Sequence, residues 1–114
     1  MTTGNEAEPL LVYITAANEE EAARIGRALV GEGLCACANV LGSVRSFYRW
    51  KGEVQDDREV ALVAKTLAGR LDEVTARVRA LHSYEIPCVV ALPITGGNPE
   101  FLGWLAAEAG GRRD

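Results

Sequence analysis

The chain contains few of the residues that define several large classes of protein. It has one histidine and three cysteines in 114 residues. An odd number of cysteines cannot form a closed set of disulfides, so in a reducing compartment the thiols are expected to be free. No apolar run reaches the roughly 18 residues that a membrane helix needs, and the start, MTTGNEAEP, lacks the features of a secretory signal. We therefore expect a cytoplasmic protein without a membrane partner.

Positive charge is also in short supply. The 12 lysine and arginine residues are outnumbered by 16 aspartate and glutamate residues, which gives a formal net charge of -4. A chain of this kind offers no basic surface to nucleic acid, so nucleic acid is not an expected partner. The content of 48% hydrophobic and 25% charged residues is typical of a soluble globular protein. We expect one domain over residues 10–108, with flexible segments at 1–9 and 109–114.

Hydrophobic patterns divide the chain into alternating strands and helices. The expected strands cover residues 10–16, 35–50, 53–66 and 86–95. The expected helices follow a cap at Asn18, begin near Ala68, and follow a second cap at Asn98. This order predicts an α+β protein of the ferredoxin-like β-α-β-β-α-β type with an added C-terminal helix. Its four strands should form an antiparallel sheet with both crossover helices on one face.

The two middle strands form a hairpin that is too long for the domain. Residues 35–50 would span roughly 50 Å at about 3.3 Å per residue, whereas a domain of this length is roughly 35 Å across. Gly42 is a candidate for a bulge or bend. Protruding strands leave edges and apolar faces that soluble proteins cover with another chain. We therefore expect a homo-oligomer in which the hairpins meet, with these residues at the interface: Cys35, Cys37, Trp50 and Val63.

The two cysteines of this hairpin are two positions apart and should point to the same face of the expected strand. Their small neighbours favour close packing over metal binding, because a bare C-x-C pair is a weak metal signal.

The only histidine, His82, stands in the segment LHSYEIPC at the end of the second helix. An imidazole there can cap the helix or form a hydrogen bond at an interface. Together with Cys88 it could instead bind Cu(I) or Zn(II), which accept nitrogen and sulfur ligands. For Cys88 the alternative is an inert thiol that packs as a small apolar residue. Both alternatives stay open for both residues.

Polar residues of the hairpin and of the histidine segment are further candidates for a ligand cleft between chains. Lys65 is the most informative, because an ammonium on an apolar strand needs a partner, which Glu59 or Glu85 could supply. An interface ion pair and a ligand-binding lysine are both consistent with the pattern. No nucleophile-base pair or phosphate-binding loop occurs, so we do not expect an enzyme. The full set is Ser46, Tyr48, Arg49, Glu59, Lys65, Tyr84 and Glu85.

Several separated segments resemble the CutA family of divalent-cation tolerance proteins. They are LCACANV at 34–40, SFYRWKG at 46–52, DRE at 57–59, KT at 65–66, HSYEIP at 82–87 and the closing Trp104. The resemblance implies a tight homotrimer held by the long hairpin, akin to the PII signalling proteins, and a link to copper or another divalent cation. It favours a regulatory protein that binds a metal ion or a small molecule in clefts between subunits. The alternative is a very stable structural or interaction trimer with only an indirect role in the metal ion response.

The chain departs from the family pattern in the first strand and around the histidine. The strand usually ends in Thr-Cys-Pro or Thr-Ala-Pro, but here Ala17 stands in place of the proline, and Ile14 stands where some relatives have a cysteine ligand. The proline that usually follows the histidine is Ser83, and the glutamate after the later proline is Cys88. Copper binding implied by the resemblance is therefore supported chiefly at His82.

Overall fold

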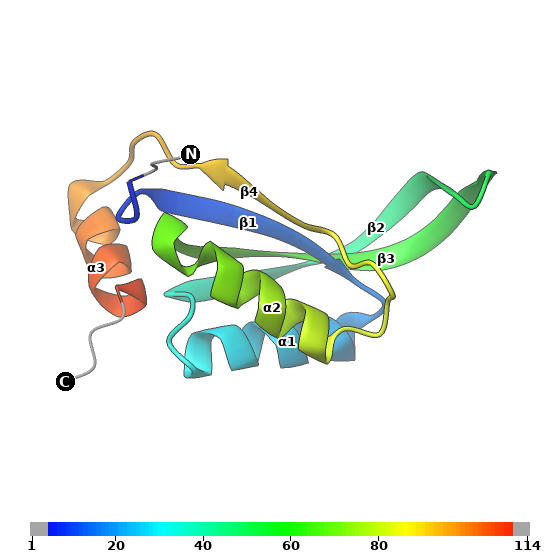
Figure 1. Cartoon of the computed structure of the whole chain (residues 1–114), viewed down its shortest axis with the longest axis horizontal. Coiled ribbons are helices and arrows are strands. Elements are labelled where there is room, and N and C mark those ends of the chain that lie inside the picture. Colours follow the sequence, from blue (N-terminus) through cyan, green and yellow to red (C-terminus); the bar gives the residue numbers. More distant parts are fainter. Residues whose placement is uncertain (1–4, 111–114) are drawn as a thin grey trace.

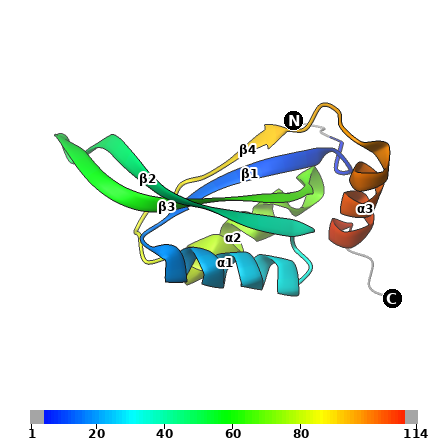
Figure 2. The same ribbon diagram turned by 180° about the vertical axis from the view of Figure 1, so that it is seen from behind.

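A computed structural model describes residues 5–110 of the chain. Its elements are β1 (Pro9–Ala16), α1 (Glu19–Gly31), β2 (Cys37–Trp50), β3 (Glu53–Leu67), a 3-10 turn (Ala68–Arg70), α2 (Leu71–Leu81), β4 (Val89–Pro93) and α3 (Pro99–Ala109). The strands form one antiparallel sheet in the order β2-β3-β1-β4. Helices α1 and α2 lie on the same side of the sheet, and α3 lies at the end opposite the hairpin tip (Figure 1; Figure 2). The predicted ferredoxin-like α+β fold is confirmed.

Several boundaries differ from those expected. β2 begins at Cys37 rather than at residue 35, because the amides of Leu34 and Cys35 still bond to the carbonyl of Leu29 at the end of α1, at 3.0 and 3.1 Å. The second helix opens with the 3-10 turn and is α-helical only from Leu71. β4 is also shorter than the expected strand over 86–95, and it begins only after Pro87, which has no N–H to donate to a sheet.

The ends of the chain were expected to be flexible over residues 1–9 and 109–114. Residues 1–4 and 111–114 lie outside the described part. Within it, the carbonyls of Glu6 and Glu8 accept hydrogen bonds from the amides of Gly69 and Ala68, at 2.9 and 2.8 Å. Residues 5–8 are therefore tied to the start of the second helix.

The core lies between the sheet and the two helices α1 and α2. Alternate residues of β1 and β3 point toward these helices, as the two-residue period of a strand requires. The cap predicted at Asn18 is present, because its side chain accepts a hydrogen bond from the amide of Glu21 at 2.8 Å. The buried core includes Val12, Ile14, Leu62 and Ala64 from the strands and Ile25, Leu29, Val74 and Val78 from the helices.

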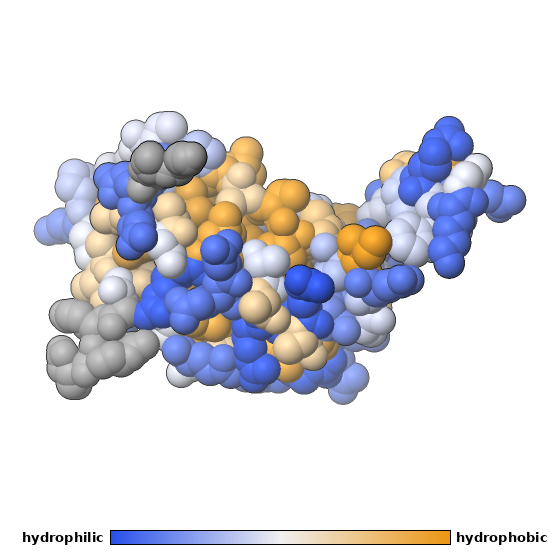
Figure 3. All heavy atoms as spheres, viewed as in Figure 1, coloured by the Kyte–Doolittle hydropathy of each residue, from blue (hydrophilic) through white to orange (hydrophobic). Residues whose placement is uncertain are grey.

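The opposite face of the sheet, here called the open face, has no helix over most of its area. It carries the alternate residues Leu11, Tyr13, Val63, Lys65, Val90 and Leu92. Val90 and Leu92 are each 52% exposed. α3 covers only one end of this face, where Leu105 and Ala109 pack on Leu67. Hydrophobic side chains reach the surface over the body of the molecule, whereas the protruding end of the hairpin is mainly polar in this view (Figure 3).

β2 and β3 extend beyond the body as a two-stranded ribbon, and the longest dimension of the molecule is 45 Å (Figure 1). The pairing register shifts between Val40 and Gly42, which confirms the predicted bulge. Gly42 has φ +122, a backbone conformation that favours glycine. At the tip, Lys51 and Gly52 both have positive φ, as a tight hairpin turn requires.

Candidate functional site at the base of the hairpin

Residues 82–88 run from the end of α2 to β4, and the side chain of His82 at their start is fully buried, at 0% exposure. Its Nε2 atom lies 2.7 Å from the carbonyl oxygen of Thr15, and its Nδ1 atom lies 3.1 Å from the amide nitrogen of Tyr84. A carbonyl can only accept and an amide N–H can only donate, so Nε2 carries the hydrogen and Nδ1 offers its lone pair. Of the two roles that the sequence left open for His82, these contacts fit the one in which it forms hydrogen bonds at the end of the helix. They leave no ring nitrogen free for a metal ion.

Glu21 was not among the predicted site residues, yet it is the only buried carboxylate in the described part of the chain, at 3% exposure. It accepts hydrogen bonds from the amide of Ala17 at 2.8 Å and from the amide and hydroxyl of Ser83 at 2.7 and 3.1 Å. Burial alone would raise the pKa of Glu21, but the bonds from Ala17 and Ser83 outweigh it and hold this pKa below the ordinary value. The carboxylate therefore fastens the start of α1 to residues 82–88.

Tyr84 extends from this segment toward the base of the ribbon. Its ring lies 4.6 Å from the ring of His82, between centroids. Burial, followed by a hydrogen bond to Glu59, raises the pKa of Tyr84. Cys88 is half-buried near the same carboxylate, and burial followed by the charge of Glu59 raises the pKa of its thiol. Tyr84, Cys88 and Glu59 thus meet where the ribbon leaves the body.

Two residues of the ribbon complete this group. The hydroxyl of Tyr48 donates to Asp57 at 2.6 Å, and that bond raises the pKa of Tyr48. We call the set Tyr48, Asp57, Glu59, Tyr84 and Cys88 the hairpin-base cluster. It holds two carboxylates, two phenols and one thiol and contains no basic side chain, so its surroundings favour a cation over an anion.

Lys65 lies outside this cluster. It is six residues from Glu59 along β3, roughly 20 Å at about 3.3 Å per residue, so the two do not pair within one chain, and their pairing between chains stays a prediction. Its Nζ atom lies 3.2 Å from Oδ1 of Asn39, 3.8 Å from Sγ of Cys37 and 5.9 Å from the ring of Phe101. None of the ion pairs among residues 5–110 involves Lys65 or Glu85.

The residues expected at an interface occupy different environments. Cys35 is 1% exposed and belongs to the core of the chain itself, where burial raises its pKa to about 12. It does not share a strand face with Cys37, because it precedes β2 and still follows the capping turn of α1. Cys37 and Val63 are half-buried on the open face, and Trp50 is exposed at the ribbon tip. Ser46 lies on the ribbon beside Asp57, its partner in the pairing register.

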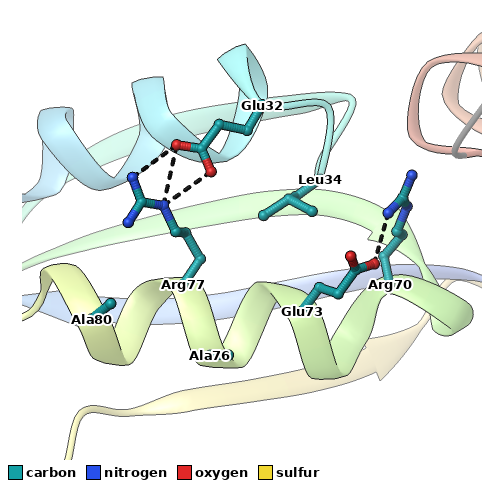
Figure 4. A pocket seen from close by; sticks show the side chains of 7 residues that line it. All are labelled: Glu32, Leu34, Arg70, Glu73, Ala76, Arg77 and Ala80. Atoms are coloured by element: carbon teal, nitrogen blue, oxygen red, sulfur yellow. Dashed lines mark hydrogen bonds and ion pairs between the residues drawn. The ribbon is translucent and has the colours of Figure 1, made fainter. Parts of the chain in front are cut away.

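Within residues 5–110, no group of three or more histidine, cysteine, aspartate or glutamate side chains could hold a metal ion. The groove between the end of α1 and α2 is also unsuitable as a ligand-binding site (Figure 4). Its arginines are already paired, Arg77 with Glu32 at 2.8 Å and Arg70 with Glu73 at 2.6 Å. A cation site at the hairpin-base cluster would need further donors from outside the chain.

The fold and the cluster together define a ferredoxin-like α+β protein with a projecting ribbon, an exposed apolar sheet face and an acidic site between them. The family model described as CutA1 divalent ion tolerance protein matches residues 10–108. The chain belongs to this family.

Individual relatives cover most of the chain. The divalent-cation tolerance protein CutA of Thermus thermophilus is 46% identical over 100 residues, which is 88% of this chain and 97% of that protein. The chloroplastic Protein CutA 1 of Oryza sativa is 40% identical over 91% of this chain, which spans only 59% of the rice protein.

Solved structures agree with the fold. CutA from Xylella fastidiosa has a TM-score of 0.86 at 34% identity, with 90% of this chain and 98% of that chain covered. The periplasmic divalent cation tolerance protein CutA from Archaeoglobus fulgidus has a TM-score of 0.85 at 39% identity, with 89% and 98% covered. The described helices include none that is both long and apolar enough to cross a membrane.

Proposed function

We propose that this chain acts as a homotrimeric, non-catalytic binding protein in the response to divalent cations. The observation that carries the proposal is the exposed apolar sheet face beside a ribbon that extends past the body. Val90 and Leu92 on the open face are each 52% exposed, and Phe47 and Val54 on the ribbon are 64% and 65% exposed. Burying such side chains between chains would stabilise an assembly by about 25 cal/mol for each Å² removed from water. The number of chains in the proposed assembly, three, is what the family resemblance implies.

The ligand in this proposal is a divalent or soft monovalent cation at the hairpin-base cluster. Within one chain, Glu59 and Cys88 offer one carboxylate and one sulfur, donors that suit copper or zinc better than magnesium or calcium. A neighbouring chain in the trimer would supply the donors that one chain lacks. His82 has no part in this set, because both its nitrogens are bonded within the chain. The protein would carry out this role in the cytoplasm.

A second candidate is a very stable structural or interaction trimer whose link to metals is indirect. It is favoured by the engaged nitrogens of His82 and by the lack of a three-ligand group among residues 5–110.

Two measurements separate these candidates. Sedimentation equilibrium at micromolar concentration should give a trimer, and a monomer would overturn both. The reduced protein is then titrated with Cu(I), Cu(II) and Zn(II), and the bound metal is counted per trimer. Glu59→Gln should weaken the binding of at least one of these ions about tenfold or more. Glu53→Gln, an exposed change at the ribbon tip, is the matched control and should leave the affinity unchanged. A trimer that binds none of these ions supports the structural alternative.

A further inference from the structure

Glu21 accepts hydrogen bonds from two backbone N–H groups that lie far apart in the sequence. One belongs to Ala17, at the end of β1, and the other to Ser83, directly after the histidine. The hydroxyl of Ser83 gives the carboxylate its third hydrogen bond. Two distant segments of the chain therefore converge on one side chain.

The hydrogen bonds of Glu21 compensate for its burial. A carboxylate that is 3% exposed is costly unless hydrogen bonds replace its water, and here Ala17 and Ser83 supply the donors. Among residues 5–110, the cations within 4 Å are Arg24, 3.9 Å from the carboxylate and largely exposed, and, when protonated, His82 at 3.8 Å. The three short bonds from Ala17 and Ser83 are therefore what fixes the carboxylate in place.

The residues on either side of Ser83 lead from this carboxylate to the hairpin-base cluster. His82 bonds to the carbonyl of Thr15 and accepts a hydrogen bond from the amide of Tyr84. Tyr84 in turn lies beside Glu59. A fixed position for Ser83 therefore determines how Tyr84 approaches the cluster.

We infer that Glu21 is a positioning residue for the candidate site. With Ala17 and Ser83 it forms a hydrogen-bonded latch that holds residues 82–88 against the start of α1. The latch depends on one buried carboxylate. The placement of Tyr84 is therefore coupled to a residue of α1 outside the cluster. The effect on ligand binding rests on the proposed function, but the latch itself does not.

The first test replaces the carboxylate by an amide. In Glu21→Gln, hydrogen exchange at the amides of Ala17 and Ser83 should become about tenfold faster or more, since a buried donor loses a charged acceptor. The ring signals of Tyr84 in NMR spectra should shift as its contact with the ring of His82 loosens. Glu20→Gln, an exposed change on the same turn of α1, is the control and should alter neither readout.

The second test asks whether Ser83 acts through Glu21. Ser83→Pro should destabilise the native chain, because it removes the amide and hydroxyl donors from Glu21. In a chain that already carries Glu21→Ala, the same change should cost clearly less stability, because no buried carboxylate then loses its donors. Such coupling between the two positions cannot come from a residue that merely fills space.

The outcomes separate this inference from the proposed function, because amide exchange and tyrosine signals need no bound cation. Unchanged Tyr84 signals in Glu21→Gln, or an equal cost of Ser83→Pro with and without Glu21, would overturn the latch. A clear effect on Tyr84 in a protein that binds no cation would support the latch and remove the proposed cation site.

Discussion

The Nε2 atom of His82 donates a hydrogen bond to the carbonyl oxygen of Thr15 over 2.7 Å, and so joins the end of α2 to the end of β1 across 67 residues of sequence. The other ring nitrogen accepts from the amide of Tyr84. The imidazole therefore satisfies two backbone groups at once. This is the structural one of the two roles that the sequence left open for His82, and the metal-ligand role stays a prediction that the next experiment tests.

The first prediction concerns this histidine. His82→Ala should lower the free energy of unfolding by about 2–4 kcal/mol, because it leaves a buried carbonyl and an amide without partners and opens a cavity. The affinity for Cu(I), Cu(II) or Zn(II) should stay within about twofold in protein that is still folded. Denaturant unfolding and metal titration measure the two effects. Loss of a bound metal ion at unchanged stability would restore His82 as a ligand.

The second prediction concerns pH. The pKa of Glu21 is lower in the folded chain than its ordinary value, so on acidification the unfolded chain takes up this proton first. The stabilisation is fully present above the ordinary glutamate pKa of about 4.3 and is lost as the pH falls through the lower folded value. The stability difference between the native chain and Glu21→Gln should therefore shrink below about pH 4. Denaturant titrations from neutral to acid pH measure it, and a constant difference would contradict the assignment.

The third prediction concerns the three thiols. Cys35 is buried in the core with a pKa raised to about 12, whereas Cys37 and Cys88 are only partly buried. The thiolate is the reactive form, so an aromatic disulfide reagent at pH 8 should modify Cys88 faster than Cys35, which should be spared until the chain unfolds. Cys37 lies on the open face and should be protected as long as the chains stay associated. Cys35→Ala identifies the phase that belongs to Cys35, because the variant should lack it. Rapid modification of Cys35 in the folded protein would show that the core is open there.

Local signals in the sequence were sufficient for much of the fold. Asn18 and Asn98 accept from the amides of Glu21 and Glu100, as their cap positions predict. The turn at residues 51–52 and the bulge beside Gly42 could also be predicted, because each depends on neighbouring residues alone.

The candidate site was less predictable, because its contacts join distant segments. Glu21 was not among the predicted site residues, because its bond to Ser83 spans 62 residues. Cys35 was assigned to a strand because an apolar alternation cannot reveal that its amide caps α1. For Lys65 the sequence offered Glu59 or Glu85 as a partner between chains; within one chain Lys65 and Glu59 lie far apart along a single strand, so the pairing stays a prediction about the assembly.

The last prediction concerns assembly through the open face. Val90→Lys places a charge on a surface that is 52% exposed in the single chain, so the subunit should still fold. If three chains bury this face, the same charge must lose its water, and the free energy of association should weaken by about 1–3 kcal/mol per chain. Val30→Lys on α1, at a valine that is 40% exposed, is the matched control and should leave assembly intact. Sedimentation equilibrium over a range of concentrations measures both variants. Equal association in Val90→Lys and in the native chain would exclude the open face as the contact surface and leave the ribbon alone to hold the chains together.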